Sequence, residues 1–460
     1  MKVSRFVEVE VELQDKQRAL NKTKACSKRE RENNEIIDTS NLLERILDRE
    51  NMFKALKTVI SNKGSHGVDG MKTYELKEHL IQNWPNIKEK LLDGSYKPSP
   101  VRRVEIPKDD GSKRLLGIPT VQDRLIQQAI AQELSKIYEP IFSENSYGFR
   151  PNKSAHKAIL KAKEYVNEGN YWVVDMDLEK FFDKVNHDIL MYKLSLTIKD
   201  KRVLKLIRKY LESGIMINGI NVTSKEGTPQ GGPLSPLLAN IMLDELDKEL
   251  DKRGHKFCRY ADDCNVYVRS KKAGERVIKS IRNIVEGKLK LKVNETKSAV
   301  DLVTRRKFLG FSFYFAKGKL EIRIHDKSLE KFKNKIREIT NRNVSMNNEF
   351  RIKKLNEITI GWLNYFGIAN IKYKVKKLEE WIRRRLRACI WKQWKKAKTR
   401  YVNLRKLGIV EKKAYEYSQT RKGYWRISKS PILNKSITNQ YLENLGYKSI
   451  CKRYQLIHSI

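Results

Sequence analysis

The chain has 460 residues, enough for two or three domains, and its 40% hydrophobic content is typical of a globular protein. It contains no run of 18 apolar residues, no apolar N-terminal core of signal-peptide length and no C-x-x-C pair among five cysteines, so we expect no membrane span, secretion, zinc ribbon or disulfide framework. Its net charge of +41 predicts attraction to polyanions.

The positive charge is distributed unevenly. Residues 371–460 hold 25 Lys and Arg against 5 Asp and Glu, so about half of the net charge lies in the last fifth of the chain. Aromatic residues are interleaved with this charge, which favours nucleic-acid binding. The alternative is that these charges only solvate helix faces.

The first third of the chain predicts helices and one hairpin. Residues 1–36 are polar, and residues 38–60 read as two amphipathic helices with Thr39 or Ser40 as the N-cap. Residues 100–120 alternate as a hairpin around the turn DDGS, and a helix is expected from about Val121 to Tyr138.

The middle of the chain predicts further strands. Residues 171–177 form an apolar strand, residues 228–236 form a loop before a helix, and KFCRY and CNVYVR form a second hairpin. Another strand is expected at 307–315, and helical patterns dominate after about Asp326. The chain is therefore expected to be an α+β body with a basic helical tail.

Acidic side chains stand at the ends of two predicted strands. Asp177 closes the strand at 171–177, and Asp262 and Asp263 lie within the second hairpin. Adjacent carboxylates repel each other unless a cation neutralises them, and hard divalent cations prefer carboxylate ligands. If the strands are neighbours, Asp177 and Asp262 would bridge two Mg²⁺ ions about 3.5–4 Å apart. The alternative is an ordinary polar turn.

Six spaced blocks resemble the polymerase blocks of group II intron-encoded reverse transcriptases. They are RLLGIPTVQDRLIQQAI (114–130), SYGFRPNKSAHKAI (146–159), VVDMDLEKFFDKVNHD, TPQGGPLSPLLAN, RYADDC and KFLGFSF. The tail, including GWLNYFGIANI (361–371), resembles the maturase or thumb region of the same family. We find no Cys-pair endonuclease domain after this region, and in this respect the chain resembles the compact class C lineage.

The resemblance implies a right-hand polymerase with an α+β fold. Fingers and palm, with an antiparallel palm sheet, would be followed by an all-α basic thumb/maturase region. The predicted domains are an N-terminal extension at 1–36, fingers and palm at 37–316, a helical thumb/maturase domain at 317–400 and a basic nucleic-acid-binding region at 401–460.

The resemblance also assigns the catalytic acids. In this family the first catalytic aspartate lies six residues before the Asp of a Phe-Asp pair, which selects Asp177. Asp262 and Asp263 are the two aspartates of the YADD box. The implied metal ligands are Asp177, Leu178, Asp262 and Asp263, which would hold two Mg²⁺ ions, with Mn²⁺ as a substitute.

Further residues are implied to bind the incoming deoxynucleoside triphosphate. Lys108 and Arg114 flank the finger turn and would contact the triphosphate, where Arg offers a bidentate fork. Phe182 falls at the position of an aromatic gate against the ribose 2′-hydroxyl. The alternatives are a solvated hairpin for the two cations and a core position for the ring.

Three more positions would complete this nucleotide site. Gln230 and Gly231 lie in a loop that would back the nascent base pair, and Lys297 resembles a lysine that protonates pyrophosphate. The alternative for Gln230 and Gly231 is an ordinary loop before a helix, and the alternative for Lys297 is a surface lysine. His187 is expected at a helix cap or on the surface.

The expected primer, template or RNA contacts are Tyr260, Arg384, Arg385, Lys392, Lys395 and Lys396. The expected partners are group II intron RNA, an RNA template with a DNA or RNA primer, target DNA and dNTPs, with no membrane and with monomer and dimer both open. The implied function is RNA-directed DNA synthesis together with splicing and retrohoming, in a bacterial cytoplasmic ribonucleoprotein. Rival functions are a domesticated reverse transcriptase of DNA repair or phage defence and a non-catalytic RNA-binding splicing cofactor.

Overall fold

The computed structural model describes residues 38–107, 111, 113–217, 220–222, 226–229 and 231–459. The predicted N-terminal extension, Lys108 and Gln230 lie outside the described residues. The described part divides into two compact units. The first unit comprises residues 38–153, 176–264 and 276–299, and the second comprises residues 154–175, 265–275 and 300–459. The domain boundaries drawn from the sequence stay a prediction.

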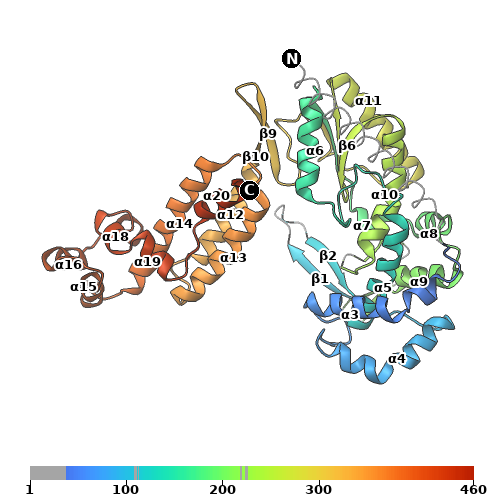
Figure 1. Cartoon of the computed structure of the whole chain (residues 1–460), viewed down its shortest axis with the longest axis horizontal. Coiled ribbons are helices and arrows are strands. Elements are labelled where there is room, and N and C mark those ends of the chain that lie inside the picture. Colours follow the sequence, from blue (N-terminus) through green and yellow to red (C-terminus); the bar gives the residue numbers. More distant parts are fainter. Residues whose placement is uncertain are drawn as a thin grey trace, which may run out of the picture. The chain divides into compact units, whose positions relative to one another are not determined.

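The first unit begins with helices and a hairpin. These elements are α2 (Leu42–Ile46), α3 (Arg49–Ser61), α4 (Leu76–Leu92), β1 (Val101–Pro107), β2 (Lys113–Ile118) and α5 (Val121–Tyr138). The strands β1 and β2 are antiparallel, and α3 packs beside α5 near this hairpin (Figure 1). The predicted hairpin and the predicted helix after it are therefore confirmed.

The predicted cap of the first helix is wrong. The N-cap of α2 is Asn41, and that of α3 is Asp48, whose side chain accepts a hydrogen bond from the backbone N–H of Glu50. Thr39 is buried instead, and its hydroxyl donates to the carbonyl of Thr197 at 3.1 Å. A partner 158 residues away along the chain therefore takes the hydroxyl that local sequence assigned to a cap.

The remainder of the first unit surrounds the hairpin with helices and short strands. Its elements are α7 (Phe181–Lys184), α8 (His187–Ser195), α9 (Lys201–Glu212), β4 (Ile215–Ile217), β5 (Ile220–Val222), α10 (Ser235–Lys252), β6 (Lys256–Tyr260) and the π-helix η1 (Asn283–Lys288). One sheet has the order β2-β1-β4-β5, in which β4 pairs in parallel with β1.

A second four-stranded sheet has the order β6-β7-β3-β8, with β3 at Trp172–Met176, β7 at Asp263–Val268 and β8 at Ala299–Leu302. Val173 and Val174 point to opposite faces of β3 and are both buried, which explains the continuous apolar run of this strand. Because β3 and β7 are neighbours, the carboxylates at the end of β3 and at the start of β7 belong to adjacent strands.

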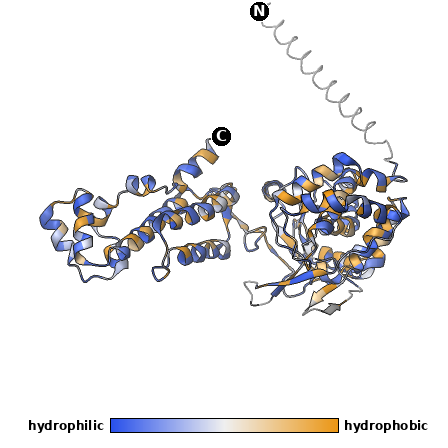
Figure 2. Cartoon of the chain, turned by 90° about the horizontal axis from the view of Figure 1, so that it is seen from below, coloured by the Kyte–Doolittle hydropathy of each residue, from blue (hydrophilic) through white to orange (hydrophobic). Residues whose placement is uncertain are grey.

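The second unit contains a hairpin and the helical tail. Its elements are α6 (Ala155–Asn167), β9 (Phe311–Ala316), β10 (Lys319–Ile324), α12 (Asp326–Ile339), α13 (Asn348–Phe366), α14 (Lys372–Gln393), α15 (Ala397–Lys406), α16 (Glu411–Ser418), α17 (Tyr424–Ile427), α18 (Pro431–Ser436), α19 (Asn439–Asn444) and α20 (Ile450–His458), while α11 (Lys271–Arg282) belongs to both units. The tail helices carry both hydrophilic and hydrophobic residues along their length (Figure 2). No helix in the described ranges has the length and apolarity to cross a membrane.

Aromatic side chains form part of the core of the second unit. Phe311 of β9 lies 5.5 Å from Tyr365 and 5.0 Å from Phe366 between ring centroids, and Trp362 stacks on Phe332 at 4.1 Å. These contacts fasten α12 and α13 onto the hairpin. The α+β body and the all-α tail that the sequence predicts are therefore present.

A buried ion pair links α10 to β6, directly before the turn between β6 and β7. The guanidinium of Arg259 makes two hydrogen bonds to Asp247, at 2.7 and 2.5 Å, and neither side chain is exposed by more than 1%. Its remaining N–H groups donate to Asn240, Ser146 and the carbonyl of Ala261. All five donors of the guanidinium are thus satisfied, which is the condition for burying it.

We expect Asp247→Asn to lower the free energy of unfolding of the first unit by about 3 kcal/mol, because the buried guanidinium loses its counter-charge. Chemical denaturation followed by fluorescence measures this change. Glu249→Gln, which breaks the solvent-facing pair with Arg253 on the same helix, is the matched control and should leave the transition unchanged. Equal effects of the two substitutions would contradict this role for the buried pair.

Candidate active site

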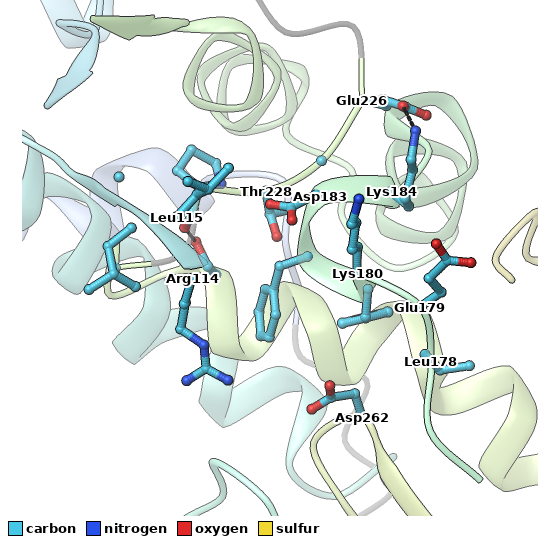
Figure 3. A pocket seen from close by; sticks show the side chains of 18 of the residues that line it. Arg114, Leu115, Leu178, Glu179, Lys180, Asp183, Lys184, Glu226, Thr228 and Asp262 are labelled. Atoms are coloured by element: carbon cyan, nitrogen blue, oxygen red, sulfur yellow. Dashed lines mark hydrogen bonds and ion pairs between the residues drawn. The ribbon is translucent and has the colours of Figure 1, made fainter. Parts of the chain in front are cut away.

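A cleft of about 1690 Å³ lies within the first unit. Its walls come from the finger strand β2, the segment after β3, the loop before α10, the turn between β6 and β7, and the loop at 292–297. Of the residues predicted from the sequence, it is lined by Arg114, Asp177, Leu178, Phe182, Gly231, Asp262 and Lys297. Figure 3 shows Arg114 and Asp262 extending into the same part of this cleft.

Asp177 is held by the loop that follows η1. Its backbone N–H donates to the hydroxyl of Ser298 at 3.1 Å, and its carbonyl accepts from the N–H of Asn294 at 2.8 Å. The side-chain amide of Asn294 donates to Oδ2 of Asp177 at 3.1 Å, and Nζ of Lys297 lies 3.5 Å from the same oxygen. The carboxylate is therefore fixed in place before any ligand binds.

Asp262 occupies a tight turn that is supported from behind. The preceding residue, Ala261, has a φ of 58°, and its carbonyl accepts from Arg259 at 2.9 Å. Gly148 lies against this turn so closely that a Cβ there would meet the N atom of Ala261 at 2.3 Å. The left-handed backbone at Ala261 is thus held by a buried cation on one side and by bare backbone on another.

The pKa of Asp262 responds to the charge of Asp177. Burial raises the pKa of Asp262 above its usual value, and the negative charge of Asp177 raises it further, whereas Arg114 and Lys297 lower it. Two carboxylates that line one cleft, one of them with a raised pKa, fit a divalent cation, since hard cations take carboxylate oxygens. Within the described ranges, no group of three or more His, Cys, Asp and Glu side chains is arranged as a metal site.

The other predicted metal ligands are placed differently. Leu178 is buried beside Asp177 and could offer only its carbonyl oxygen to a cation. Asp263 begins β7, is half-buried and does not line the cleft. Their assignment as ligands stays a prediction.

The two phenylalanines after Asp177 have different surroundings. Phe181 is 2% exposed and belongs to the core, whereas Phe182 is half-buried and lines the cleft. Their rings meet edge to face with centroids 5.2 Å apart, so Phe181 supports Phe182 from below. Phe181 is therefore the phenylalanine that belongs to the hydrophobic core. The role of Phe182 as a gate against the ribose 2′-hydroxyl stays a prediction.

The loop before α10 packs against its neighbours through backbone atoms. Gly231 has a φ of 136°, and a Cβ there would meet the carbonyl oxygen of Gly117 in β2 at 2.7 Å. The carbonyl of Gly227 lies 2.6 Å from Nε2 of His187. His187 is buried, so its expected position on the surface is wrong, although it does open helix α8.

The predicted nucleic-acid contacts lie elsewhere in the chain. Tyr260 is half-buried, with its ring 6.4 Å from that of the exposed Phe149. In the second unit, Arg385 donates to the hydroxyl of Thr340 at 2.5 Å and Lys392 to the side chain of Asn343 at 3.0 Å. Lys395 and Lys396 are exposed. Their roles, and that of Arg384, stay predictions.

Sequence reasoning missed the residues that position the acids. Arg259 contacts the turn and Asp247 holds Arg259, while Asn294 and Ser298 bond to Asp177, but the sequence assigned no role to any of these four residues. The only available signal was Arg259 itself, a charged residue inside the apolar strand KFCRY, because a charge in a buried strand requires a partner.

Comparison with known proteins agrees with this geometry. The profile of the reverse transcriptase (RNA-dependent DNA polymerase) family matches residues 106–313, and that of the group II intron maturase-specific domain matches residues 329–408. Protein YkfC of Escherichia coli (strain K12) is 35% identical over 56% of this chain and 78% of its own length. The group II intron-encoded protein LtrA of Lactococcus lactis subsp. cremoris is 41% identical over 45% of this chain and 34% of its own length.

A chain of a solved partial Cas6-RT-Cas1–Cas2 complex is also similar, with 26% identity over 53% of this chain and 42% of that chain, but its TM-score of 0.35 is too low to carry an argument. The matches define the chain as a reverse transcriptase, an RNA-directed DNA polymerase. More particularly, it belongs to the family of group II intron-encoded reverse transcriptases with a maturase domain. The predicted family, fold class and enzyme class are confirmed. Reverse transcriptases of this kind use divalent metal ions.

We expect Asp262→Asn to raise the thermal stability of the metal-free protein at neutral pH. The raised pKa of Asp262 means that the native state binds its proton more tightly than the unfolded state, so stability is lost as the pH rises through that pKa. The neutral amide removes this loss. Differential scanning calorimetry between pH 4 and 7 measures it, and a wild-type transition with the same pH dependence as the variant would contradict the raised pKa.

Proposed function

We propose that the chain copies RNA into cDNA at this cleft, with two Mg²⁺ ions held by Asp177 and Asp262 and supported by Asp263 and the carbonyl of Leu178. The observation that carries the proposal is that Asp177 and Asp262 line one cleft, where burial first, and then the charge of Asp177, raise the pKa of Asp262. When bound, such ions lower the pKa of the primer 3′-hydroxyl and neutralise charge on the departing pyrophosphate.

Side chains around the two acids would bind the triphosphate and supply a proton to the leaving group. The 3′-oxygen of the primer bonds to the α-phosphorus of the dNTP, and the bond from that phosphorus to pyrophosphate breaks. Arg114, on β2, offers its guanidinium to the triphosphate, and the family resemblance assigns the same role to Lys108. Lys297, more than half exposed beside Asp177, would give a proton to the leaving pyrophosphate.

The nascent base pair would rest on bare backbone. Gly231 would face the pair at a position where β2 leaves no room for a side chain on the glycine, and the family resemblance assigns the same role to Gln230. Tyr260 would support the primer end. Catalysis in this scheme is chiefly positioning and charge neutralisation, as in other phosphoryl transfers.

A second proposed role is binding of the parent intron RNA, to assist its splicing and its insertion into target DNA. The match of the maturase-specific domain to residues 329–408 and the excess of basic residues at 371–460 support this role. Phosphate contacts by Arg384, Arg385, Lys392, Lys395 and Lys396 would supply affinity without sequence specificity. A place in a cytoplasmic ribonucleoprotein is part of this proposal.

We expect Asp177→Asn to reduce extension of a DNA primer on an RNA template by about 10³-fold or more, since removing one charge weakens the grip on both cations. Single-turnover extension with Mg²⁺ and a preannealed substrate measures the rate. The control is Asp188→Asn, an exposed acid outside the cleft that pairs with Arg208. Retained extension in Asp177→Asn with a wild-type rate constant would refute the assignment of this acid.

We expect Phe182→Val to raise the use of ribonucleotides relative to deoxyribonucleotides by about tenfold, because the smaller side chain leaves space for the 2′-hydroxyl. The ratio of kcat/KM for rCTP and dCTP measures this preference. Phe181→Leu, a change in the buried neighbour, is the control for altered packing and should leave the ratio near its wild-type value. An unchanged ratio in Phe182→Val would remove this ring from the gate role.

A further inference from the structure

A second hollow, of about 840 Å³, lies within the second unit between α14 and the short helices α17, α18 and α19. Its lining includes five basic side chains and one acid, Glu380. The basic residues are Lys377, Arg383, Arg384, Arg387 and Lys429. Three of them, at positions 377, 384 and 387, follow one stripe of α14, because residues three, four or seven apart share a helix face.

Arg384 is held in a fixed orientation without an acidic partner. Its guanidinium lies 3.8 Å above the ring of Trp425, and its Nη2 donates to the carbonyl of Trp425 at 2.9 Å. Nε lies 3.4 Å from the hydroxyl of Ser428. Stacking and neutral acceptors thus preorganise the guanidinium, and its contacts in the described part of the chain are with uncharged groups.

Arg387 presents the same arrangement in a more buried place. Only 8% of the residue is exposed, yet Nε donates to the carbonyl of Ile437 at 2.9 Å and Nη2 to the amide oxygen of Asn439 at 3.1 Å, both neutral. Its pKa is lowered, first by burial and then by the charge of Arg383. Arg383 itself is compensated by Glu379 at 2.6 Å, so the uncompensated charge of this wall is that of Arg384 and Arg387.

A buried cation without a counter-ion is costly, and the cost falls when an anion enters. The two guanidinium groups lie one helical turn apart, and both are fixed through Nε and one N–H of Nη2. The N–H groups on their Nη1 side match the oxygens of a phosphate. The opposite wall carries side-chain amides and a hydroxyl, at Asn434, Thr438, Asn439 and Gln440, and Trp381 contributes an aromatic edge to the lining. Amides and hydroxyls pair with base edges and with the 2′-hydroxyl.

We propose that this hollow binds one unpaired nucleotide of an RNA strand, with its phosphate on Arg384 and Arg387 and its base and ribose against the α18–α19 wall. Arg387 is buried at the base of the hollow. A nucleotide can reach it only if its base is unstacked from its neighbours, so an unpaired nucleotide is favoured over an RNA duplex. The proposal rests on the intron-binding role and names the nucleotide-sized site within it.

The test uses the full chain and three fluorescently labelled probes of 12 nucleotides or base pairs. They are single-stranded RNA, single-stranded DNA of the same sequence and blunt-ended duplex RNA. Fluorescence anisotropy is measured over a series of salt concentrations. Arg387→Gln and Arg384→Gln should each weaken single-stranded RNA binding by about tenfold and lower the salt slope by about 0.7, the loss of one phosphate contact. Duplex affinity should change by less than about twofold.

The matched controls separate this site from general charge. Lys412→Gln removes an exposed charge on α16, outside the hollow, and should have little effect on the single strand. Arg387→Lys keeps the charge but loses the fork, so affinity should fall while the salt slope is retained. Calorimetry shows whether Arg387→Gln remains folded, and the less buried Arg384→Gln provides the same test with less risk to folding.

The outcomes are distinct. Equal loss on duplex and single-stranded RNA in both Arg→Gln variants, or a loss in Lys412→Gln as large as theirs, would overturn the proposal in favour of diffuse attraction. Equal loss on RNA and DNA single strands would overturn the choice of RNA. Absence of binding to every RNA probe by the wild-type chain would mark failure of the intron-binding role on which the proposal rests, whereas wild-type binding that persists unchanged in both Arg→Gln variants would overturn this site alone.

Discussion

Two carboxylates of like charge, Asp177 and Asp262, share one cleft, and much of the first unit serves to keep them there. Burial first, and then the charge of Asp177, raise the pKa of Asp262. Left alone, two like charges would separate. They are kept in place because neither belongs to a free loop. Asp177 ends a strand buried on both faces, and Asp262 lies in a turn backed by closely packed backbone.

The turn that carries Asp262 is supported by polar groups rather than by apolar packing, and polar groups can fix the orientation of a carbonyl. Arg259 satisfies all its donors inside the protein, and one of them fixes the carbonyl of Ala261 directly before Asp262. An apolar side chain could fill this space but could not hold a carbonyl in one orientation. The buried ion pair therefore contributes geometry to the site, in exchange for the free energy of desolvating two charges.

The two units use arginine in contrasting ways. In the first unit, Arg259 is neutralised by Asp247 and acts only within the protein. In the second, Arg384 and Arg387 are oriented by an aromatic ring and by neutral oxygens, and their charge remains available to an anion. Oriented but uncompensated guanidinium groups are typical of phosphate recognition, whereas compensated ones are typical of structure.

Local pattern was sufficient for the elements and for the motif residues. The alternating strands of the finger hairpin, the helix from Val121 to Tyr138 and the acids at strand ends follow from periodicity and spacing, and their sites follow from family resemblance. Contacts between distant segments were not predictable. Thr39 bonds to Thr197, His187 to Gly227 and Arg259 to Ser146, each across 40 or more residues, so no local signal identifies them.

The most direct measurement of the central claim is anomalous diffraction from crystals of the chain soaked with Mn²⁺, a substitute for Mg²⁺. Manganese peaks should lie about 2.2 Å from carboxylate oxygens of both Asp177 and Asp262. Manganese bound to one of these acids alone, or only at other sites on the chain, would contradict a shared metal centre and with it the proposed chemistry of the cleft.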